Sequence, residues 1–240
     1  TEKEVAILSD VSLIYGSVKA LDQISLSLPA GGMVGLIGPD GVGKSSLLAL
    51  LAGARKIQQG QIEVLNADIG DRHLRDTLLP RIAYMPQGLG RNLYPTLSVT
   101  ENVDFFARLF GQHRSERLAR IKELLNATGL TPFHDRPAAK LSGGMKQKLA
   151  LSCALIHKPA VLFLDEPTTG VDAVSRKEFW EMLQNLKKAG ITILVSTPYM
   201  DEAARCDRVA LMQAGKVMSI NSPAGIIAQF GKKLYAVRAS

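Results

Sequence analysis

The sequence predicts an α/β fold with a mixed sheet core around a phosphate-binding loop, an antiparallel β subdomain and an inserted α-helical subdomain. Three observations lead to this prediction. Residues 38–46 read GPDGVGKSS and match the pattern G-x-x-x-x-G-K-[ST]. An apolar strand at residues 33–37 precedes this loop, and a helix from Ser45 to Ala52 follows it. Short strand-like runs fill residues 5–37, whereas helical patterns fill the middle of the chain.

The predicted phosphate-binding loop offers the groups that an anionic ligand requires. Its glycines let the backbone fold tightly and turn several N–H groups toward one anion, and the next helix adds its partial positive charge. Lys44 can reach the β- and γ-phosphates, and the Ser45 hydroxyl is placed to bind Mg²⁺. A glycine-rich turn without a ligand is the alternative, which the strand and helix on either side disfavour. The predicted contacts are Gly38, Pro39, Asp40, Gly41, Val42, Gly43, Lys44, Ser45 and Ser46.

The composition is that of a globular chain with one large domain. Of its 240 residues, 46% are hydrophobic and 21% are charged. The net charge of +7 permits contact with nucleic acid or an anionic membrane face, but the charges are dispersed. Cys153 and Cys206 form no C-x-x-C pattern, so neither a disulfide nor a zinc site is predicted and a reducing cytosol is the default. No apolar run approaches the length of a membrane span, so a membrane role requires a partner.

Short apolar runs predict the strands of the first part of the chain. Tyr15 precedes a glycine, and its ring could stack on an adenine, although a core or turn tyrosine is the simpler interpretation. Gln87 ends the last of these runs after a charged loop, and its carboxamide oxygen could ligate a metal or hold a water. Ordinary polar surface is the alternative for Gln87. The predicted strands are residues 5–8, 13–16, 24–29, 61–65 and 82–87.

Helical patterns dominate residues 88–158. Ser98 and Glu101 form a capping box that opens an apolar helix closed by Gly111. Ser115 is predicted to open a second helix, on which Leu118, Ile121, Leu124 and Leu125 share one face.

Ser142 caps a third helix from Met145 to about His157. Gly143 and Gly144 at its start expose N–H groups to an anion, although an ordinary helix cap would have the same spacing.

The second half of the chain returns to alternating strands and helices. Residues 161–166 form an apolar strand that ends in Asp165 and Glu166. Beside a phosphate loop, the first carboxylate can bind Mg²⁺ and the second can accept a proton from the attacking water. Asp172 is predicted to cap the next helix. A buried strand, a hairpin and a last short helix complete the prediction, at residues 191–196, 208–220 and from 222 onward.

Taken together and in this order, these motifs closely resemble the ATP-binding cassette (ABC) ATPase family. The resemblance covers residues 5–227, and its most specific part is LSGGMKQ at residues 141–147. It implies a single ABC ATP-binding domain over 1–240. It further implies a RecA-like core with a β subdomain at about 1–87 and 159–220, a helical subdomain at about 88–158, and a C-terminal extension or linker at 221–240.

The resemblance also implies roles for single residues. Tyr15 matches the aromatic that stacks on adenine, and Glu166 matches the catalytic base that activates water. Mg²⁺ would be held by Ser45, Gln87 and Asp165. Because two cassettes of this family sandwich two ATPs head to tail, Ser142, Gly143 and Gly144 would contact the γ-phosphate of ATP on the opposite cassette. The connecting loop between the two sites would be Gly170, Val171 and Asp172.

One position departs from the family pattern. The resemblance aligns Pro198 with the histidine that contacts the γ-phosphate and orients the water. Proline has neither a side-chain donor nor a backbone N–H. The site built on this chain's own phosphate loop is therefore expected to bind ATP but to hydrolyse it slowly. With this departure, the chain most resembles the first cassette of tandem bacterial ABC ATPases associated with multidrug-type exporters.

The resemblance predicts partners and a location. A second cassette would complete the sites, and a transmembrane permease would dock near Gln87 and the helix at residues 98–111. The chain would then lie on the cytoplasmic side of the inner membrane and power export of a drug or another hydrophobic solute. The first alternative is a soluble ABC ATPase associated with ribosomes, and the positive net charge is compatible with this role. A chromosome-maintenance ATPase is disfavoured because the interval between Lys44 and Ser142 is too short for a long coiled coil.

Overall fold

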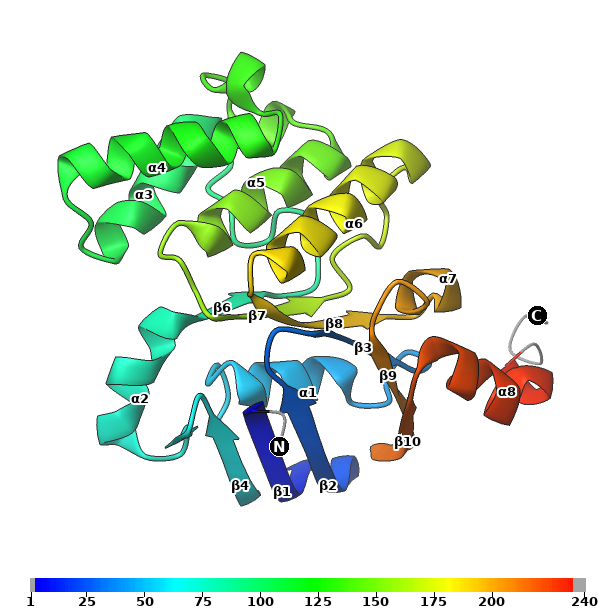
Figure 1. Ribbon diagram of the computed structural model, residues 1–240. Helices are drawn as coiled ribbons and strands as arrows, with labels where there is room; N and C mark the ends of the chain where they lie inside the picture. Colours follow the sequence, from blue (N-terminus) through cyan, green and yellow to red (C-terminus); the bar gives the residue numbers. More distant parts are fainter. Residues whose placement is uncertain (1–2, 235–240) are drawn as a thin grey trace.

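The computed structural model describes residues 3–234, which form two sheets and a helical layer (Figure 1). Within those residues, the strands are β1 Glu4–Tyr15, β2 Val18–Pro29, β3 Met33–Ile37, β4 Gln59–Val64, β5 Ala67–Asp68, β6 Ile82–Met85, β7 Val161–Asp165, β8 Thr192–Thr197, β9 Arg208–Gln213 and β10 Lys216–Asn221. The helices are α1 Lys44–Leu51, α2 Arg72–Leu78, α3 Val99–Leu109, α4 Arg114–Ala127, α5 Gly143–Leu155, α6 Ala173–Lys188, α7 Met200–Ala203 and α8 Pro223–Leu234.

The two sheets differ in strand direction. One is antiparallel with the order β2-β1-β4-β5, and the other has the order β10-β9-β3-β8-β7-β6. In the second sheet, strands β9, β3, β8, β7 and β6 run parallel, and β10 pairs antiparallel with β9. Parallel strands end at one common edge, so segments that follow β3, β6, β7 and β8 meet there although they are far apart in the sequence. The predicted mixed core and antiparallel β subdomain are confirmed.

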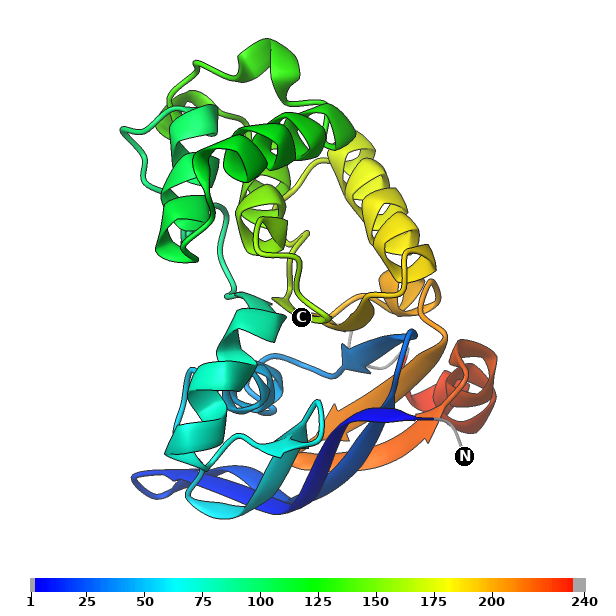
Figure 2. The same cartoon turned by 60° about the vertical axis from the view of Figure 1, so that its left-hand side comes forward.

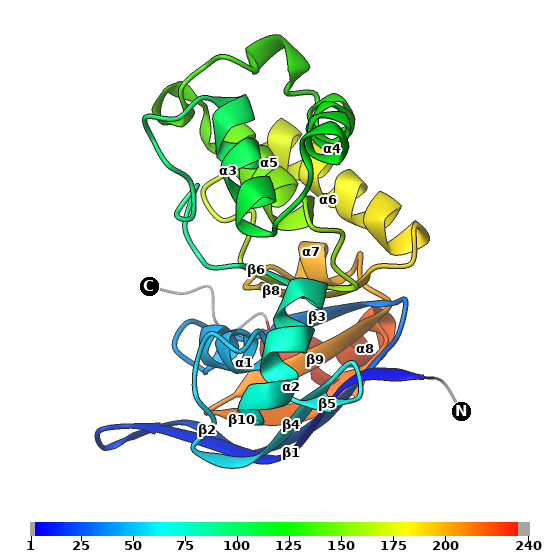
Figure 3. The same cartoon turned by 90° about the vertical axis from the view of Figure 1, so that its left-hand side faces the viewer.

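The six-stranded sheet separates two hydrophobic cores. Helices α3, α4, α5 and α6 cover one face, and α1 with the antiparallel sheet covers the other (Figures 2 and 3). Side chains of a strand point alternately to the two faces. In β7, Leu162 and Leu164 therefore join the core under the helical layer, whereas Val161 and Phe163 join the core that contains α1. Strands buried on both faces are continuous apolar runs, and this explains the unbroken sequence of β7.

Several predicted elements differ from the structure at the N-terminal end. The runs at residues 5–8 and 13–16, except Gly16, belong to the single strand β1, which continues through Asp10 with a positive φ of 50° and a register shift. The charged loop before β6 instead contains β5, helix α2 and a 3-10 turn at Leu79–Arg81. Helix α2 lacked an apolar periodicity because Leu78 is its one buried residue.

The helical layer confirms most of the predicted helix ends. The capping box at Ser98 and Glu101 is present at the start of α3. Helix α4 begins at Arg114 after His113, so the prediction that Ser115 opens it is wrong. Of the four residues predicted to share one face of α4, Ile121, Leu124 and Leu125 are buried, whereas Leu118 is 51% exposed. The last predicted helix is α8, and residues 235–240 of the predicted C-terminal extension lie outside the described residues.

A buried asparagine joins α3 to the segment that leads into it. Asn102 is 0% exposed, and its Nδ2 donates to the carbonyl oxygens of Tyr94, Leu97 and Ser98 at 3.0–3.1 Å. Its Oδ1 accepts a hydrogen bond from Tyr94 N at 2.8 Å. One side chain thus contacts four backbone groups of this segment. The three carbonyl oxygens also accept backbone N–H groups, whereas the acceptor of Tyr94 N within residues 3–234 is Asn102.

Replacing this asparagine is expected to destabilise the protein. Asn102→Ala should lower the free energy of unfolding by about 2–3 kcal/mol, because it removes four hydrogen bonds of a fully buried side chain and takes the acceptor from Tyr94 N. Urea denaturation followed by circular dichroism measures the change. Asn126→Ala on the exposed side of α4 is the control and should change the value by less than about 0.5 kcal/mol. Equal effects for the two variants would contradict this account of Asn102.

Candidate ATP-binding site

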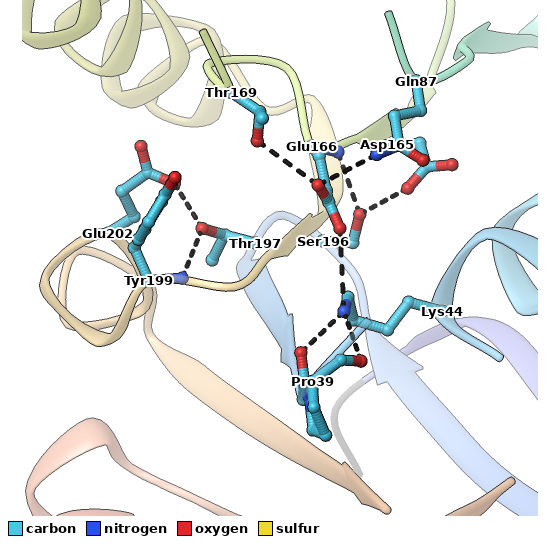
Figure 4. A network of polar contacts seen from close by, with 11 residues as sticks. Pro39, Lys44, Gln87, Asp165, Glu166, Thr169, Ser196, Thr197, Tyr199 and Glu202 are labelled. Atoms are coloured by element: carbon cyan, nitrogen blue, oxygen red, sulfur yellow. Dashed lines mark hydrogen bonds and ion pairs between the residues drawn. The ribbon is translucent and has the colours of Figure 1, made fainter. Parts of the chain in front are cut away.

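The predicted site residues meet at the edge of the sheet where the parallel strands end. The phosphate loop follows β3, Gln87 follows β6, and Glu166 follows β7 directly. Figure 4 shows Lys44, Gln87, Asp165 and Glu166 converging in one network of polar contacts. Parallel pairing of β3 with β8 and of β8 with β7 places these groups together.

The phosphate loop is fixed by close contact with neighbouring strands. A Cβ on Gly43 would lie 2.4 Å from the Ala20 carbonyl oxygen, and one on Gly38 would lie 2.5 Å from the Met212 carbonyl oxygen. Only glycine fits at both positions, because any Cβ would overlap with backbone atoms. Gly41 has open space around it but a φ of +78°, which favours glycine for conformational reasons.

Lys44 is almost fully buried at the centre of the site. Its side chain is 4% exposed, and Nζ donates to the carbonyl oxygens of Gly38 at 2.6 Å and Pro39 at 3.0 Å. Nζ also lies 3.6 Å from Glu166 Oε1 (Figure 4). An ammonium removed from water requires acceptors of this kind. The lysine is therefore positioned by the loop itself, between the loop and the predicted catalytic carboxylate.

Glu166 is held in a strained backbone conformation. Its φ of 46° is unusual for a residue with a side chain. The backbone N–H donates to Ser196 Oγ at 2.9 Å, and the carboxylate accepts hydrogen bonds from Gln87 Nε2 at 3.1 Å and Thr169 Oγ1 at 3.3 Å. Burial raises the pKa of Glu166, the Lys44 ammonium opposes this rise, and the Asp40 and Asp165 carboxylates add to it. A carboxylate with a raised pKa is a better proton acceptor.

Two adjoining cavities contain the predicted ligand contacts. One of about 300 Å³ is lined by the phosphate loop together with Tyr15, Gln87 and Glu166. The other, of about 190 Å³, is lined by Ser45, Gln87 and Asp165, the three residues predicted to contact Mg²⁺, and by Tyr15 and Ser46. Tyr15 lines both, and its hydroxyl lies 3.2 Å from Ser46 Oγ.

The residues around these cavities fit a triphosphate and a magnesium ion. No side chain within residues 3–234 caps the start of α1, so its first N–H groups remain available to an anion. The oxygens of Ser45, Gln87 and Asp165 are the hard ligands that Mg²⁺ prefers. Asp165 is held in place by Ser196, whose Oγ donates to its Oδ1 at 2.7 Å.

The predicted trans contacts lie elsewhere in the same chain. Ser142 caps α5 by accepting a hydrogen bond from Met145 N at 3.2 Å, as predicted. A Cβ on Gly144 would lie 2.4 Å from Ser175, and one on Gly143 would lie 3.7 Å from the Gly170 carbonyl oxygen. Among the described residues that line the two cavities, Ser142, Gly143 and Gly144 are not present. One chain therefore does not bring the two predicted halves of an ATP site together.

Pro198 follows the last residue of β8 and is half-buried. It lies at the same sheet edge as the other site residues, but neither cavity has Pro198 among its described lining residues. A local hydrogen bond stabilises the segment around Pro198, in which Tyr199 N donates to Thr197 Oγ1 at 3.1 Å.

A family model described as ABC transporter matches residues 21–169, which include the phosphate loop, Gln87, Ser142 and Glu166. The chain belongs to the ABC transporter family. It is an ATP-binding cassette with ATPase chemistry and uses ATP with Mg²⁺. Within residues 3–234, no helix combines the length and apolar character needed to cross a membrane. In this family, cassettes dimerise and work with transmembrane permease components.

The cassette is similar to curated proteins of several transport systems. It is 44% identical over 209 residues to the probable multidrug ABC transporter ATP-binding protein YbhF of Escherichia coli K12, covering 85% of this chain and 35% of that protein. It is 38% identical over 229 residues to the Nod factor export ATP-binding protein I of Sinorhizobium fredii, covering 95% of this chain and 66% of that one. For the Fe(3+) ions import ATP-binding protein FbpC of E. coli K12, the identity is 37%, with 98% of this chain and 67% of that one covered. The cassette thus spans about a third of YbhF and about two thirds of the other two.

Two solved structures resemble the cassette closely. The structure of cbiO1 from Clostridium perfringens, part of the ABC transporter complex cbiONQ, gives a TM-score of 0.86 at 28% identity, with 98% of each chain covered. The dimeric post-hydrolysis state of the ATP-binding cassette MJ0796, bound to ADP and Pi, gives a TM-score of 0.82 at 25% identity, with 91% of this chain and 98% of that one covered. The predicted ABC-type fold is confirmed.

The structure adds groups to the cassette's site that the sequence did not single out. Arg55 places its guanidinium carbon 4.6 Å from the centre of the Tyr15 ring and lines the smaller cavity. Tyr84 lines the same cavity, and burial together with the Asp165 carboxylate raises its pKa to about 12. Ser196 lies at the end of the predicted strand 191–196. That position, at the end of a strand like that of Asp165, could have indicated it as a site residue. No local pattern marked Arg55.

Neutralising the predicted base of the cassette should stabilise the fold. Because the folded-state pKa of Glu166 is raised, the fold favours its neutral form. The stabilisation that protonated Glu166 gives the folded state is complete below the unfolded-state pKa. It is lost as the pH rises through the folded-state pKa. Glu166→Gln should therefore raise Tm at pH 7.5, with a gain that shrinks toward pH 4, and should lower kcat by roughly 100-fold or more.

Thermal unfolding at several pH values and a phosphate-release assay measure both effects. Glu63→Gln on the exposed face of β4 is the matched control and should leave both unchanged. A fall in Tm for Glu166→Gln at pH 7.5 would contradict the predicted sign.

Proposed function

We propose that this cassette binds Mg-ATP in the two cavities beside Lys44 and Glu166 and powers export through a partner membrane domain. The observation that carries this proposal is the placement of the buried Lys44 ammonium 3.6 Å from Glu166, with the free start of α1 on one side and Asp165 on the other. In this proposal, Lys44 and the loop N–H groups bind the phosphates, and Tyr15 stacks on the adenine ring. Glu166 accepts the proton of the attacking water.

Magnesium, when bound, draws charge from the phosphate oxygens and so makes the γ-phosphate easier to attack. The chain's contribution is to place its own oxygen ligands. We propose Ser45, Gln87 and Asp165 for this role, because all three line one cavity. Ser196 orients Asp165 through the hydrogen bond from its Oγ.

A second cassette completes the site in this proposal. Ser142, Gly143 and Gly144 lie at the start of α5, where Ser142 is exposed, Gly143 is half-buried and Gly144 is buried. They are not among the described lining residues of this chain's own cavities, and in this proposal they contact ATP bound by the partner cassette. Gly143 lies beside the Gly170 carbonyl, so the loop of Gly170 to Asp172 supports the same surface. We retain the predicted division into a core, a β subdomain and a helical subdomain at about 88–158.

Export is favoured over import by the names of the relatives. YbhF, described as a probable multidrug protein, and the Nod factor export protein are 44% and 38% identical, whereas the iron importer FbpC is 37% identical.

The proposed permease docks near Gln87 and α3, where Tyr94, Phe105 and Leu109 expose aromatic and aliphatic surface. The cassette would then act at the cytoplasmic side of the inner membrane. Cosedimentation with ribosomes rather than with membrane proteins would favour the ribosome-associated alternative.

Pro198 limits the proposed hydrolysis rate. A residue at this position without a donor cannot hydrogen-bond the γ-phosphate or orient the attacking water. Glu166 is still held in place by its contacts with Gln87 and Thr169, so the site keeps a base. We propose that this cassette binds ATP well and that its partner cassette carries most of the turnover.

Restoring a histidine at this position is expected to accelerate hydrolysis. Pro198→His should raise kcat about 10-fold or more, because the imidazole supplies the missing donor. Phosphate release at saturating Mg-ATP measures it. Tyr199→His is the matched control, since Tyr199 is the exposed next residue and a histidine there should not raise kcat. An unmodified chain that already turns over at roughly 1 per second or more would contradict the impaired-site proposal.

Removing the buried lysine tests the nucleotide site itself. Lys44→Ala should weaken Mg-ATP binding by about 1.5–3 kcal/mol, or roughly 10- to 100-fold in Kd, because charge-assisted hydrogen bonds to phosphate are lost. Calorimetry with Mg-ATP measures the change. Lys122→Ala on the exposed side of α4 should leave the Kd unchanged. Failure of the folded wild-type chain to bind Mg-ATP would overturn the proposed function.

A further inference from the structure

A second buried carboxylate, outside the phosphate-loop site, joins three segments of the chain. Glu202 on α7 is 2% exposed. Its Oε1 accepts hydrogen bonds from Thr168 Oγ1 at 2.5 Å and from Arg176 Nε at 2.6 Å. Its Oε2 accepts a hydrogen bond from Thr197 Oγ1 (Figure 4). A carboxylate this far from water needs several donors, and each of these comes from a different segment.

Two of these donors belong to segments that hold the proposed catalytic groups. Thr168 lies two residues after Glu166, in the same loop as Thr169, which donates to the Glu166 carboxylate. Thr168 also accepts a hydrogen bond from Trp180 Nε1 at 3.3 Å, so its hydroxyl is both a donor and an acceptor. Thr197 is the last residue of β8 and directly precedes Pro198. Glu202 therefore fixes the chain on either side of the proposed reaction site.

The third donor connects this network to the proposed partner surface. Arg176 lies in the first turn of α6, next to Ser175, which packs directly on Gly144 of the turn at the start of α5. The guanidinium also donates to Asp201 at 2.8 Å and lies 4.8 Å from the centre of the Tyr199 ring. Helix α6 is thereby linked to α7 and to Tyr199, which directly precedes α7.

We infer that Glu202 is a positioning residue for ATP hydrolysis, which fixes the Pro198 segment relative to the Glu166 loop and links both to α6. The inference rests on the proposed function of the site. Pro198 offers the γ-phosphate no hydrogen bond, so nucleotide cannot position this segment through that residue. The protein's own carboxylate does so instead, and the arrangement exists before nucleotide binds.

The carboxylate is specifically required, because all three contacts to its oxygens are donated to it. A glutamine keeps the size of Glu202, but its NH₂ group cannot accept a hydrogen bond. Within residues 3–234, it also leaves Arg176 with the exposed Asp201 as its one anionic partner. Glu202→Gln should therefore release one segment from the network without changing the cavities around Lys44.

The test compares turnover with binding in a background that hydrolyses ATP. In the full chain carrying Pro198→His, adding Glu202→Gln should lower kcat by about 10- to 100-fold, because catalytic groups shift out of position. The Kd for Mg-ATP should stay within about twofold, since Glu202 does not line the cavities among their described residues. The matched control is Asp201→Asn, which removes a carboxylate from the same arginine, but one whose side chain is 76% exposed. It should change kcat by less than about twofold.

Amide hydrogen exchange provides a second readout that does not depend on nucleotide. Glu202→Gln should speed exchange in residues 168–172 and 199–201 together, and Asp201→Asn should not. An unchanged kcat in a folded protein, or equal losses of kcat and Mg-ATP affinity, would overturn the positioning role. If the wild-type chain itself hydrolyses ATP rapidly, the impaired-site proposal fails and the same comparison is made without Pro198→His. If no chain binds Mg-ATP, the proposed function fails, and unchanged exchange in Glu202→Gln is then the result that overturns the Glu202 network.

Discussion

The rest of this structure depends on a lysine ammonium that is kept away from water. Lys44 is held by the carbonyl oxygens of Gly38 and Pro39 and lies opposite the carboxylate of Glu166. Burying such a charge is costly unless acceptors surround it, so the loop has to wrap around the side chain before any ligand arrives. The glycines, the contact with β2 and β9, and the start of α1 all serve that requirement. Phosphate oxygens would then meet a cation whose position is already set, which reduces the entropy lost on binding.

The topology explains why residues distant in sequence act together. Each strand of the parallel set ends at one edge, and the alternation of side chains along the strands fills a core on either face. The polar groups of the site are thus gathered at the strand ends, where Asp165, Glu166 and Ser196 are buried and pair with one another. Ser196 shows the result, since its side chain and backbone hold Asp165 and Glu166 from the neighbouring strand.

The sequence was sufficient wherever short-range chemistry decides the structure. The loop around Lys44, the capping box at Ser98 and the cap at Asp172 could be predicted because each involves residues within a few positions of one another. The sequence was insufficient where burial is decided by partners distant in the chain. Helix α2 buries a single side chain and so leaves no periodic pattern, and Leu118 is 51% exposed although it shares a predicted helix face with three buried residues. The contacts of Arg55 with Tyr15, and of Glu202 with its three donors, likewise arise from tertiary packing alone.

The close packing of the phosphate loop affects how mutations in it can be interpreted. A side chain at Gly43 would push the loop away from β2 of the antiparallel sheet, and one at Gly38 would push it away from β9 of the six-stranded sheet. Loss of activity after such a change would report a damaged junction between the sheets as readily as a lost phosphate contact. Gly41, which has free space around it, is the position in this loop where a substitution isolates the backbone conformation from that damage.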